Sequence, residues 1–336
     1  MVRLFGLQDV LLLRRLRPRC VGFDLRRLLL DAPSPMSSAL LGYFSHHHLG
    51  AITCVREDMI DGKSLWGFAQ VWPRPDRPEW DLGCLAPALT SNGDADLWRG
   101  LLNDLVLFGV ERGILRIYAR ASEDTQTEDV LRQAGFTLIT REEVFALSHC
   151  EEPASRSRPA GLRPVSSQDG WALSELYRQA VPQLVRRTEE LPTRLVAAAG
   201  SGLPALTPTD EYVWAEEGRI IAHLGLCRSP KGYWLEVVAL PRCRADTSPH
   251  IRYMLSLAMC SPRTPVYCPV PDYAAGLGQV LRALGFEAYA RQVLLVLHTA
   301  ARVPVRRQRR VMGLEGRADV RTPLGHISPE ECGQKP

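Results

Sequence analysis

A seven-residue segment near the middle of the chain recurs almost unchanged near its end. Residues 130–136 read VLRQAGF and residues 280–286 read VLRALGF, an offset of 150 residues. Self-similarity of this kind is typical of a chain that contains one fold more than once. Since the chain has 336 residues, two copies fit within it at the size of ordinary domains. The repeat therefore predicts two copies of one unit, each of roughly 140 to 150 residues.

Two further patterns recur in the same order. A tryptophan followed seven residues later by a proline occurs twice, at an offset of 154, and a Gln-Asp pair that opens a helical pattern occurs twice, at an offset of 160. Three correspondences in one order, with a slowly changing offset, indicate that the whole unit is repeated. The positions are Trp80 and Pro87 with Trp234 and Pro241, and Gln8-Asp9 with Gln168-Asp169.

The boundaries between the copies follow from local composition. Residues 151–161, EEPASRSRPAG, are polar and rich in Pro and Ser, which is typical of a linker. We therefore predict a first domain at 1–150 and a second at 162–299. The last segment, 300–336, has little periodic apolar content and contains the run RRQRR, so we expect a flexible Arg-rich tail there.

Periodicity and turn residues predict the same order of elements in both copies: a short strand, one or two helices, antiparallel strands, a helix, a strand, a helix and a last strand. In the first copy the expected strands are 2–5, 50–56, 65–72, 79–85, 114–121 and 143–148, and the helices are 8–16, 95–112 and 127–134. In the second copy they are strands 162–165, 233–240, 264–268 and 288–298, a hairpin at 211–226, and helices 168–180, 185–199, 249–259 and 277–284.

The formal net charge of +4 comes from the tail. Residues 1–150 carry 17 basic and 19 acidic side chains, and residues 151–300 carry 16 and 14, so the two long segments nearly cancel. Residues 301–336 carry 8 and 4. A nucleic-acid-binding domain normally has a marked basic excess, so the two domains are not expected to bind nucleic acid. The basic run of the tail is interpreted as a solvated terminus.

Cysteine usage and hydropathy restrict the cellular setting. The nine cysteines are scattered and include no C-x-x-C pair, which argues against a disulfide framework and against a zinc finger. No apolar run approaches the roughly 18 to 20 residues that span a bilayer. We therefore expect a cytoplasmic protein without a membrane partner.

His46-His47-His48 is interpreted as a polar turn, because adjacent strand residues point to opposite faces, and no metal site is predicted.

The order of elements, with a final helix that ends in L-R-x-x-G-F before the last strand, resembles the GCN5-related N-acetyltransferase (GNAT) superfamily. The segments Leu162-Arg163-Pro164 and YVWAEEGRIIAHLGL at 212–226 are good local matches. The resemblance covers most of the chain, and the arrangement of two copies is similar to that of tandem GNAT proteins. It implies an α+β fold with two tandem GNAT-like acyl-CoA N-acyltransferase units, each a mixed, mainly antiparallel sheet flanked by helices.

The resemblance also implies where a cofactor would bind. In GNAT proteins the fourth strand parts from the fifth, its backbone bonds the pantetheine arm, and the following turn and helix N-terminus bind the pyrophosphate. In the first copy that turn contains Asp94 and Asp96, which would repel phosphate, so this copy is expected to be degenerate. In the second copy the turn contains two arginines that could pair with phosphate. The resemblance therefore implies acetyl-CoA at Val238, Leu240, Arg242, Cys243 and Arg244.

The expected catalytic groups depart in part from the family pattern. Many GNAT enzymes have a tyrosine acid four residues before the glycine of G-F, where this chain has Leu131 and Leu281. Three tyrosines nearby could substitute, of which Tyr273 is the candidate acid. A carboxylate on the fourth strand is the usual base, which makes Glu236 the candidate base. The other two tyrosines are Tyr267 and Tyr289.

These features lead to two functional hypotheses. The first is an acyl-CoA-dependent N-acyltransferase that acetylates a primary amine of a small molecule or peptide, with the cofactor in the second copy. The second is a non-catalytic GNAT-like binding or scaffold protein, because the phosphate turn is degenerate in both copies and leucine replaces both tyrosines. The acceptor has no portable motif in the sequence, since one fold hosts many specificities. No motif in the sequence indicates the oligomeric state.

Overall fold

The computed structural model describes residues 2–31, 34–46, 50–60, 62–74, 77–90, 94–148, 157–189, 209–258 and 264–299. All of them fall within the structural unit Met1–Val303. We call residues 2–148 the N half and residues 157–299 the C half. The predicted tail at 300–336 and most of the predicted linker lie outside the described residues.

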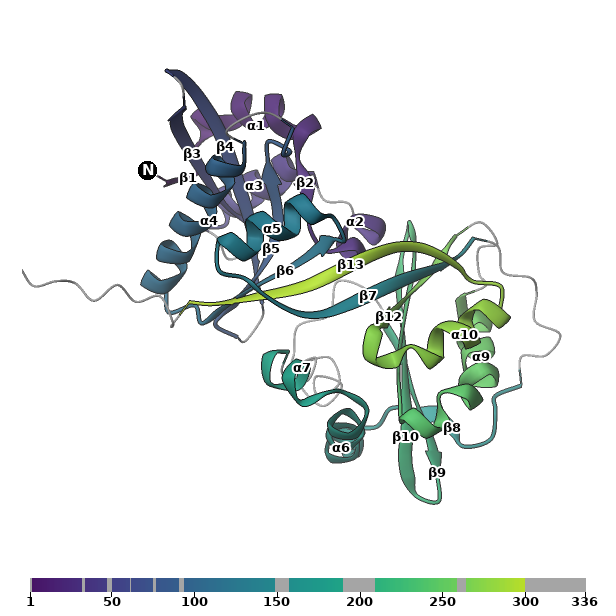
Figure 1. Ribbon diagram of the computed structural model, residues 1–336. Helices are drawn as coiled ribbons and strands as arrows, with labels where there is room; N and C mark the ends of the chain where they lie inside the picture. The colour runs from purple at the N-terminus through teal and green to yellow at the C-terminus, as the bar shows by residue number, and fades with distance from the viewer. Residues whose placement is uncertain are drawn as a thin grey trace, which may run out of the picture. The chain divides into compact units, whose positions relative to one another are not determined.

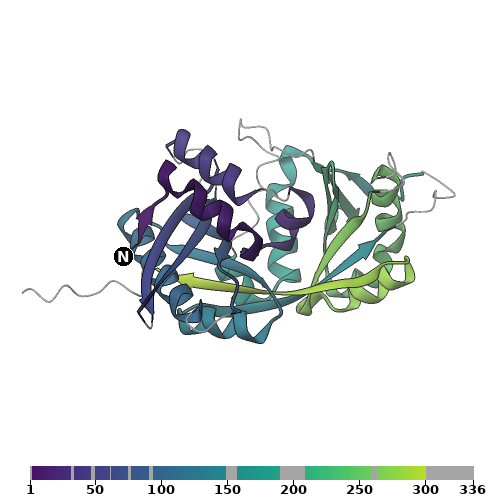
Figure 2. The same ribbon diagram turned by 90° about the horizontal axis from the view of Figure 1, so that it is seen from above.

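Thirteen strands of the described residues form one continuous sheet (Figures 1 and 2). Their order across the sheet is β1-β3-β4-β5-β6-β13-β7-β12-β11-β10-β9-β8, and β2 pairs with β5. In the N half they are β1 Arg3–Leu4, β2 Val21–Gly22, β3 Ile52–Ile60, β4 Lys63–Pro73, β5 Glu79–Ala86, β6 Arg116–Ser122 and β7 Thr137–Leu147. In the C half they are β8 Leu162–Pro164, β9 Thr209–Glu216, β10 Arg219–Ser229, β11 Gly232–Ala239, β12 Val266–Pro271 and β13 Glu287–His298.

Helices cover both faces of this sheet. On one face, α4 and α5 pack on the N half and α9 and α10 on the C half, each pair closing a separate hydrophobic core. On the other face, α1 and α3 pack on the N half and α6 and α7 on the C half. The helices are α1 Val10–Leu16, α2 Leu25–Leu30, α3 Pro35–Phe44, α4 Asp94–Glu111, α5 Thr125–Gln133, α6 Gly170–Ala180, α7 Gln183–Thr188, α9 Ser248–Ala258 and α10 Gly276–Ala283. Among the described residues, no helix is long and apolar enough to cross a membrane.

The two halves exchange their last strands. β13, the last strand of the C half, lies between β6 and β7 of the N half, and β7 in turn pairs with β12 of the C half. Figure 1 shows β7 and β13 running side by side between the halves. Leu295 of β13 is 0% exposed and packs in the N-half core. The division into domains at 1–150 and 162–299 stays a prediction, because the halves share strands within a single sheet.

The repeat of the final helix is confirmed at the level of hydrogen bonds. Gly135 and Gly285 both take the left-handed conformation, with φ of 95° and 87°, directly after α5 and α10. Each following phenylalanine donates its N–H to a leucine carbonyl five residues earlier, at 3.0 Å in both copies. This is a glycine-dependent helix C-cap, which requires a residue that tolerates positive φ. L-R-x-x-G-F therefore encodes the same local structure twice.

The repeat at the start of each copy is also confirmed. Asp9 accepts the N–H of Gly6 and pairs with Arg3, while Asp169 accepts the N–H of Ser166 and pairs with Arg163. The hydrogen bond from the guanidinium contributes to lowering the pKa of each aspartate, against the opposing effect of desolvation. A buried carboxylate thus opens the first helical segment of both halves.

The tryptophan correspondence does not hold in three dimensions. Trp80 faces α4, where its ring lies 6.0 Å from that of Phe108. On β11 the side facing α9 is taken by Tyr233 and Leu235, so Trp234 points to the opposite face, where it packs against Leu30 of α2. The two tryptophans therefore occupy different faces of the sheet, because one residue of register reverses the side to which a strand residue points.

Candidate functional site

Each half contains two parallel strands that part from one another. In the C half, β11 and β12 have two registered pairs, Tyr233 with Val266 and Trp234 with Tyr267, although the strands continue to Ala239 and Pro271. In the N half, β5 and β6 have three such pairs and likewise continue beyond them. A gap between parted strands leaves backbone N–H and C=O groups available to a ligand.

In the N half this gap is filled by the chain itself. β2 pairs with β5 at Leu85 and Cys84, on the edge that β6 leaves. Phe23 donates its N–H to Gly83 of β5 at 2.9 Å, and Asp24 donates its N–H to Arg120 of β6 at 2.8 Å. Residues 21–24 thus bridge the two strands and use the backbone groups that a pantetheine arm would need.

The turn after β5 is also satisfied internally. Asp94 is 0% exposed and accepts the N–H of Thr90 at 3.0 Å and a hydrogen bond from Arg19 at 3.4 Å. A carboxylate of the chain therefore takes a backbone donor of the segment in which the resemblance would place a phosphate. Both observations favour the prediction that the N half does not bind a cofactor.

In the C half the backbone direction of β11 revises two expected residues. Leu240 donates its N–H to Ile221 of β10 at 3.0 Å, so this donor faces β10. Because backbone groups of a strand alternate in direction, the N–H of Val238 also faces β10. The edge that β12 leaves therefore presents Val237 and Ala239. The side chains of Val238 and Leu240 instead join the hydrophobic cluster beneath α6.

The turn after β11 consists of two short 3-10 helices, Pro241–Cys243 and Ala245–Thr247, followed directly by α9. Arg244 donates to the carbonyls of Tyr273 at 2.8 Å and Ala180 at 3.4 Å, and burial lowers its pKa. Its guanidinium thus holds the turn to neighbouring elements. Cys243 is buried in the same hydrophobic cluster. Arg242 is exposed, which leaves its charge available for a phosphate.

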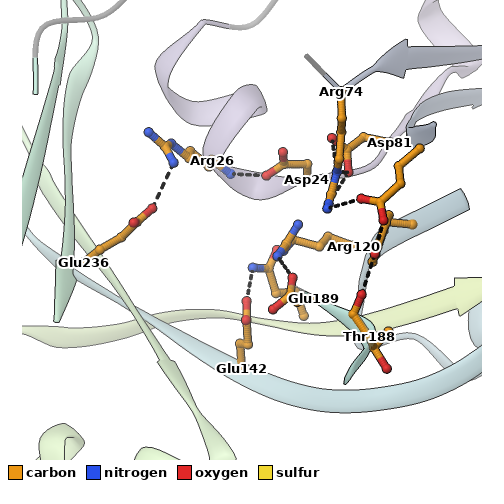
Figure 3. Close-up of polar contacts among 12 residues, drawn as sticks. Asp24, Arg26, Arg74, Asp81, Arg120, Glu142, Thr188, Glu189 and Glu236 are labelled. Carbon is orange, nitrogen blue, oxygen red and sulfur yellow. Dashed lines mark hydrogen bonds and ion pairs between the residues drawn. The ribbon is translucent and has the colours of Figure 1, made fainter. Parts of the chain in front are cut away.

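Glu236 of β11 is partly exposed and forms an ion pair with the N half. Its carboxylate accepts from Nη1 of Arg26, on α2, at 2.8 Å (Figure 3). The position of α2 follows from Asp24, which caps the helix by accepting the N–H of Arg26. The N half therefore contributes a charged group to the site of the C half, which a pattern search within either copy cannot find.

Tyr273 lies in the short helix after β12, and its side chain packs among residues of both C-half clusters. Burial, together with Tyr177 and the carboxylates of Glu189 and Glu142, raises the pKa of its phenol, so the hydroxyl stays protonated at neutral pH. The backbone carbonyl of Tyr273 accepts the hydrogen bond from Arg244. Among the described residues, no hydrogen bond links Tyr273 to Glu236.

A second set of charged side chains lies beside the ion pair of Arg26 and Glu236, where strands of both halves meet (Figure 3). Arg120 of β6 pairs with Glu189, and Glu142 of β7 accepts from Gln292 of β13 at 2.7 Å. Burial raises the pKa of Glu142, while the charge of Arg120 opposes the rise. These residues carry no motif in the sequence, because only the strand exchange brings them together.

The described residues contain no group of three or more His, Cys, Asp and Glu side chains placed to hold a metal ion. His46 is described and lies in a turn after α3, whereas His47 and His48 lie outside the described residues.

Comparison with known proteins gives matches among solved structures. No protein-family model and no curated protein matches the sequence. A GCN5-related N-acetyltransferase from Sphaerobacter thermophilus is similar at a TM-score of 0.52 and 16% identity, over 89% of this chain and 95% of that one. A functionally unknown conserved protein from Staphylococcus epidermidis gives 0.50 and 13%, over 68% and 90%. A tandem GNAT protein from the clavulanic acid biosynthesis pathway gives 0.45 and 14%, over 74% and 83%.

At these identities the similarity concerns the fold alone. The chain belongs to the α+β class, with one mixed sheet flanked by helices and a pair of parted parallel strands in each half. Its fold is the GNAT fold, as the element order predicted.

Proposed function

We propose that the protein is an acyl-CoA-dependent N-acyltransferase whose cofactor site lies in the C half, between β11 and β12. The observation that supports this most strongly is the difference between the two gaps. Residues 21–24 fill the gap of the N half. In the C half, β11 and β12 part after Trp234, and no other described strand pairs with either of them at the gap. One acyl-CoA per chain is therefore expected.

Acetyl-CoA would supply an activated acyl group. The N–H groups of Val237 and Ala239, on the edge of β11 that β12 leaves, would hold its pantetheine arm and polarise the thioester carbonyl. Arg242 would pair with phosphate through its exposed guanidinium. Arg244, which is bonded to two carbonyls, would keep the turn in place rather than bind phosphate.

The acid and base follow from the charges of the same region. The carboxylate of Glu236, held by its ion pair with Arg26, would accept the proton that leaves the amine. Tyr273 keeps its proton at neutral pH and could protonate the departing thiolate. The acceptor would be a primary amine of a small molecule or peptide, with α2 of the N half forming part of its site. The six cysteines described are free, which suits the cytoplasm.

Titration calorimetry of the full chain with acetyl-CoA tests the cofactor site. We expect one site per chain and roughly tenfold weaker binding in Arg242→Glu, since the substitution reverses a charge beside the phosphates. Arg14→Glu makes the same charge change at an exposed position of α1, and this variant should bind acetyl-CoA like the wild type. No heat at millimolar acetyl-CoA, or equal weakening in both variants, would contradict the proposal.

A binding protein without catalysis is the second candidate. It is favoured by Leu131 and Leu281, which are both 0% exposed in hydrophobic cores and so provide no acid at the usual tyrosine position. Acetyl-CoA binding with no release of free thiol across a panel of primary amines would support this candidate over the enzyme.

A further inference from the structure

Open space lies over Gly225, a buried residue in the middle of the C-half sheet. Gly225 of β10 is paired with Glu211 of β9 on one side and with Glu236 of β11 on the other. Residues directly opposite one another in adjacent strands point to the same face. The two carboxylates therefore flank the glycine on the face that Arg26 approaches.

The glycine leaves room between these carboxylates. Gly225 is buried, yet a Cβ added to it would meet only one atom within 4 Å, Cε1 of His223 at 3.7 Å. That distance is an ordinary van der Waals contact. The space over Gly225 is therefore at least as large as a methyl group, and the imidazole of His223 forms one of its walls.

Two acceptors beside this space lack partners. Nε2 of His223 and Oε2 of Glu211 are buried and have no hydrogen-bond partner among the described residues. His223 is 4% exposed, and burial lowers its pKa to about 4, so the ring is neutral at neutral pH. Burial also raises the pKa of Glu211, and the charge of Glu236 adds to the rise. An unsatisfied buried polar atom destabilises the folded state, and a ligand with N–H donors would remove that cost.

We propose that the space bounded by Glu211, His223 and Glu236 binds the primary ammonium group of the acceptor. An ammonium has three N–H donors, and three acceptors are provided by the two carboxylates and by Nε2 of His223, which accepts when the neutral ring carries its proton on Nδ1. The charges agree, because two carboxylates face a single guanidinium, that of Arg26, and a neutral imidazole, which leaves an excess negative charge for a monocation. The identification of the ligand as the acceptor rests on the proposed function, whereas ammonium binding itself does not.

Propylamine is a suitable probe because it presents one ammonium on a short apolar chain. The test follows the imidazole resonance of His223 by NMR in the full chain, assigned by its loss in His223→Gln. We expect propylamine to shift this resonance at neutral pH, and propanol, which lacks the charge, to bind roughly tenfold more weakly.

Two variants and a control define the site. Gly225→Ala places a methyl group in the space at an ordinary contact distance, and Glu211→Gln keeps the shape while removing the charge. Each should weaken propylamine binding roughly tenfold. Gly170→Ala is the matched control, because a Cβ there meets nothing within 4 Å. Equal affinity in Gly225→Ala and wild type, or no response of His223 to propylamine, would overturn the proposal and leave water as the occupant.

Acetyl-CoA titration of the same samples separates the two proposals. Acetyl-CoA binding without a propylamine response would overturn the ammonium site and leave the cofactor site standing. A propylamine response without acetyl-CoA binding would support the ammonium site and contradict the proposed function.

Discussion

Replacing Leu295 with alanine is expected to lower the free energy of unfolding by about 2 to 5 kcal/mol, through a cavity in the half to which the residue does not belong by sequence. Leu295 lies on β13, opposite Ala119 of β6 and Leu138 of β7. Its side chain is fully buried in the N-half core together with Trp80 and other residues of the first copy. Urea unfolding followed by tryptophan fluorescence measures the loss.

Glu287→Ala is the control for this prediction, because Glu287 lies exposed at the start of the same strand. We expect it to change stability by no more than about 0.5 kcal/mol. If β13 instead folded back on its own half, Leu295→Ala would leave the N-half core intact. A loss for Leu295→Ala as small as that of Glu287→Ala would therefore contradict the strand exchange.

The strand exchange illustrates what local patterns can and cannot predict. The sequence predicts a strand at 288–298, and the structure has one at Glu287–His298. Its partner could not be predicted, because the two copies have similar final strands and alternation of apolar residues does not distinguish one neighbour from another. The glycine caps after α5 and α10 were predictable, because they depend on contacts within a few residues.

The candidate site divides in the same way. Glu236 was found because the resemblance places a carboxylate base on the fourth strand. Arg26 was not found, because α2 is a short helix that the apolar pattern did not predict. Val238 was placed on the correct strand, and Leu240 directly follows that strand, yet the direction of their N–H groups depends on pairing with β10. His223 and Glu211 have no motif, since burial and the space over Gly225 exist only once three strands are assembled.

Replacing Arg120 with methionine is expected to destabilise the protein by about 3 kcal/mol at pH 7.5, because it leaves two largely buried carboxylates, those of Glu142 and Glu189, without their cation. The guanidinium of Arg120 pairs with Glu189, and its side chain is only 23% exposed. It also opposes the rise that burial imposes on the pKa of Glu142. Methionine fills similar volume, so the loss reflects charge rather than a cavity.

The pH dependence of this loss identifies the group responsible. The pKa of Glu142 in the folded state is already above its usual value, and removal of Arg120 raises it further. A carboxyl with a raised folded pKa favours the folded state while it is protonated, and this stabilisation is lost as the pH rises through that pKa. The loss caused by Arg120→Met should therefore be smaller at pH 5 than at pH 7.5, as measured by urea unfolding at both values.

A second substitution tests the assignment to Glu142. Arg120→Met combined with Glu142→Gln removes both charges and keeps an acceptor for Gln292, so part of the stability at pH 7.5 should return and the pH dependence should weaken. Arg99→Met is the matched control, because Arg99 is 41% exposed and pairs with Asp96, which is 65% exposed, on the surface of α4. Its expected cost is no more than about 1 kcal/mol. A loss from Arg120→Met that is equal at both pH values and unchanged by Glu142→Gln would mean that the arginine contributes through packing, and that the charges between the halves do not govern stability.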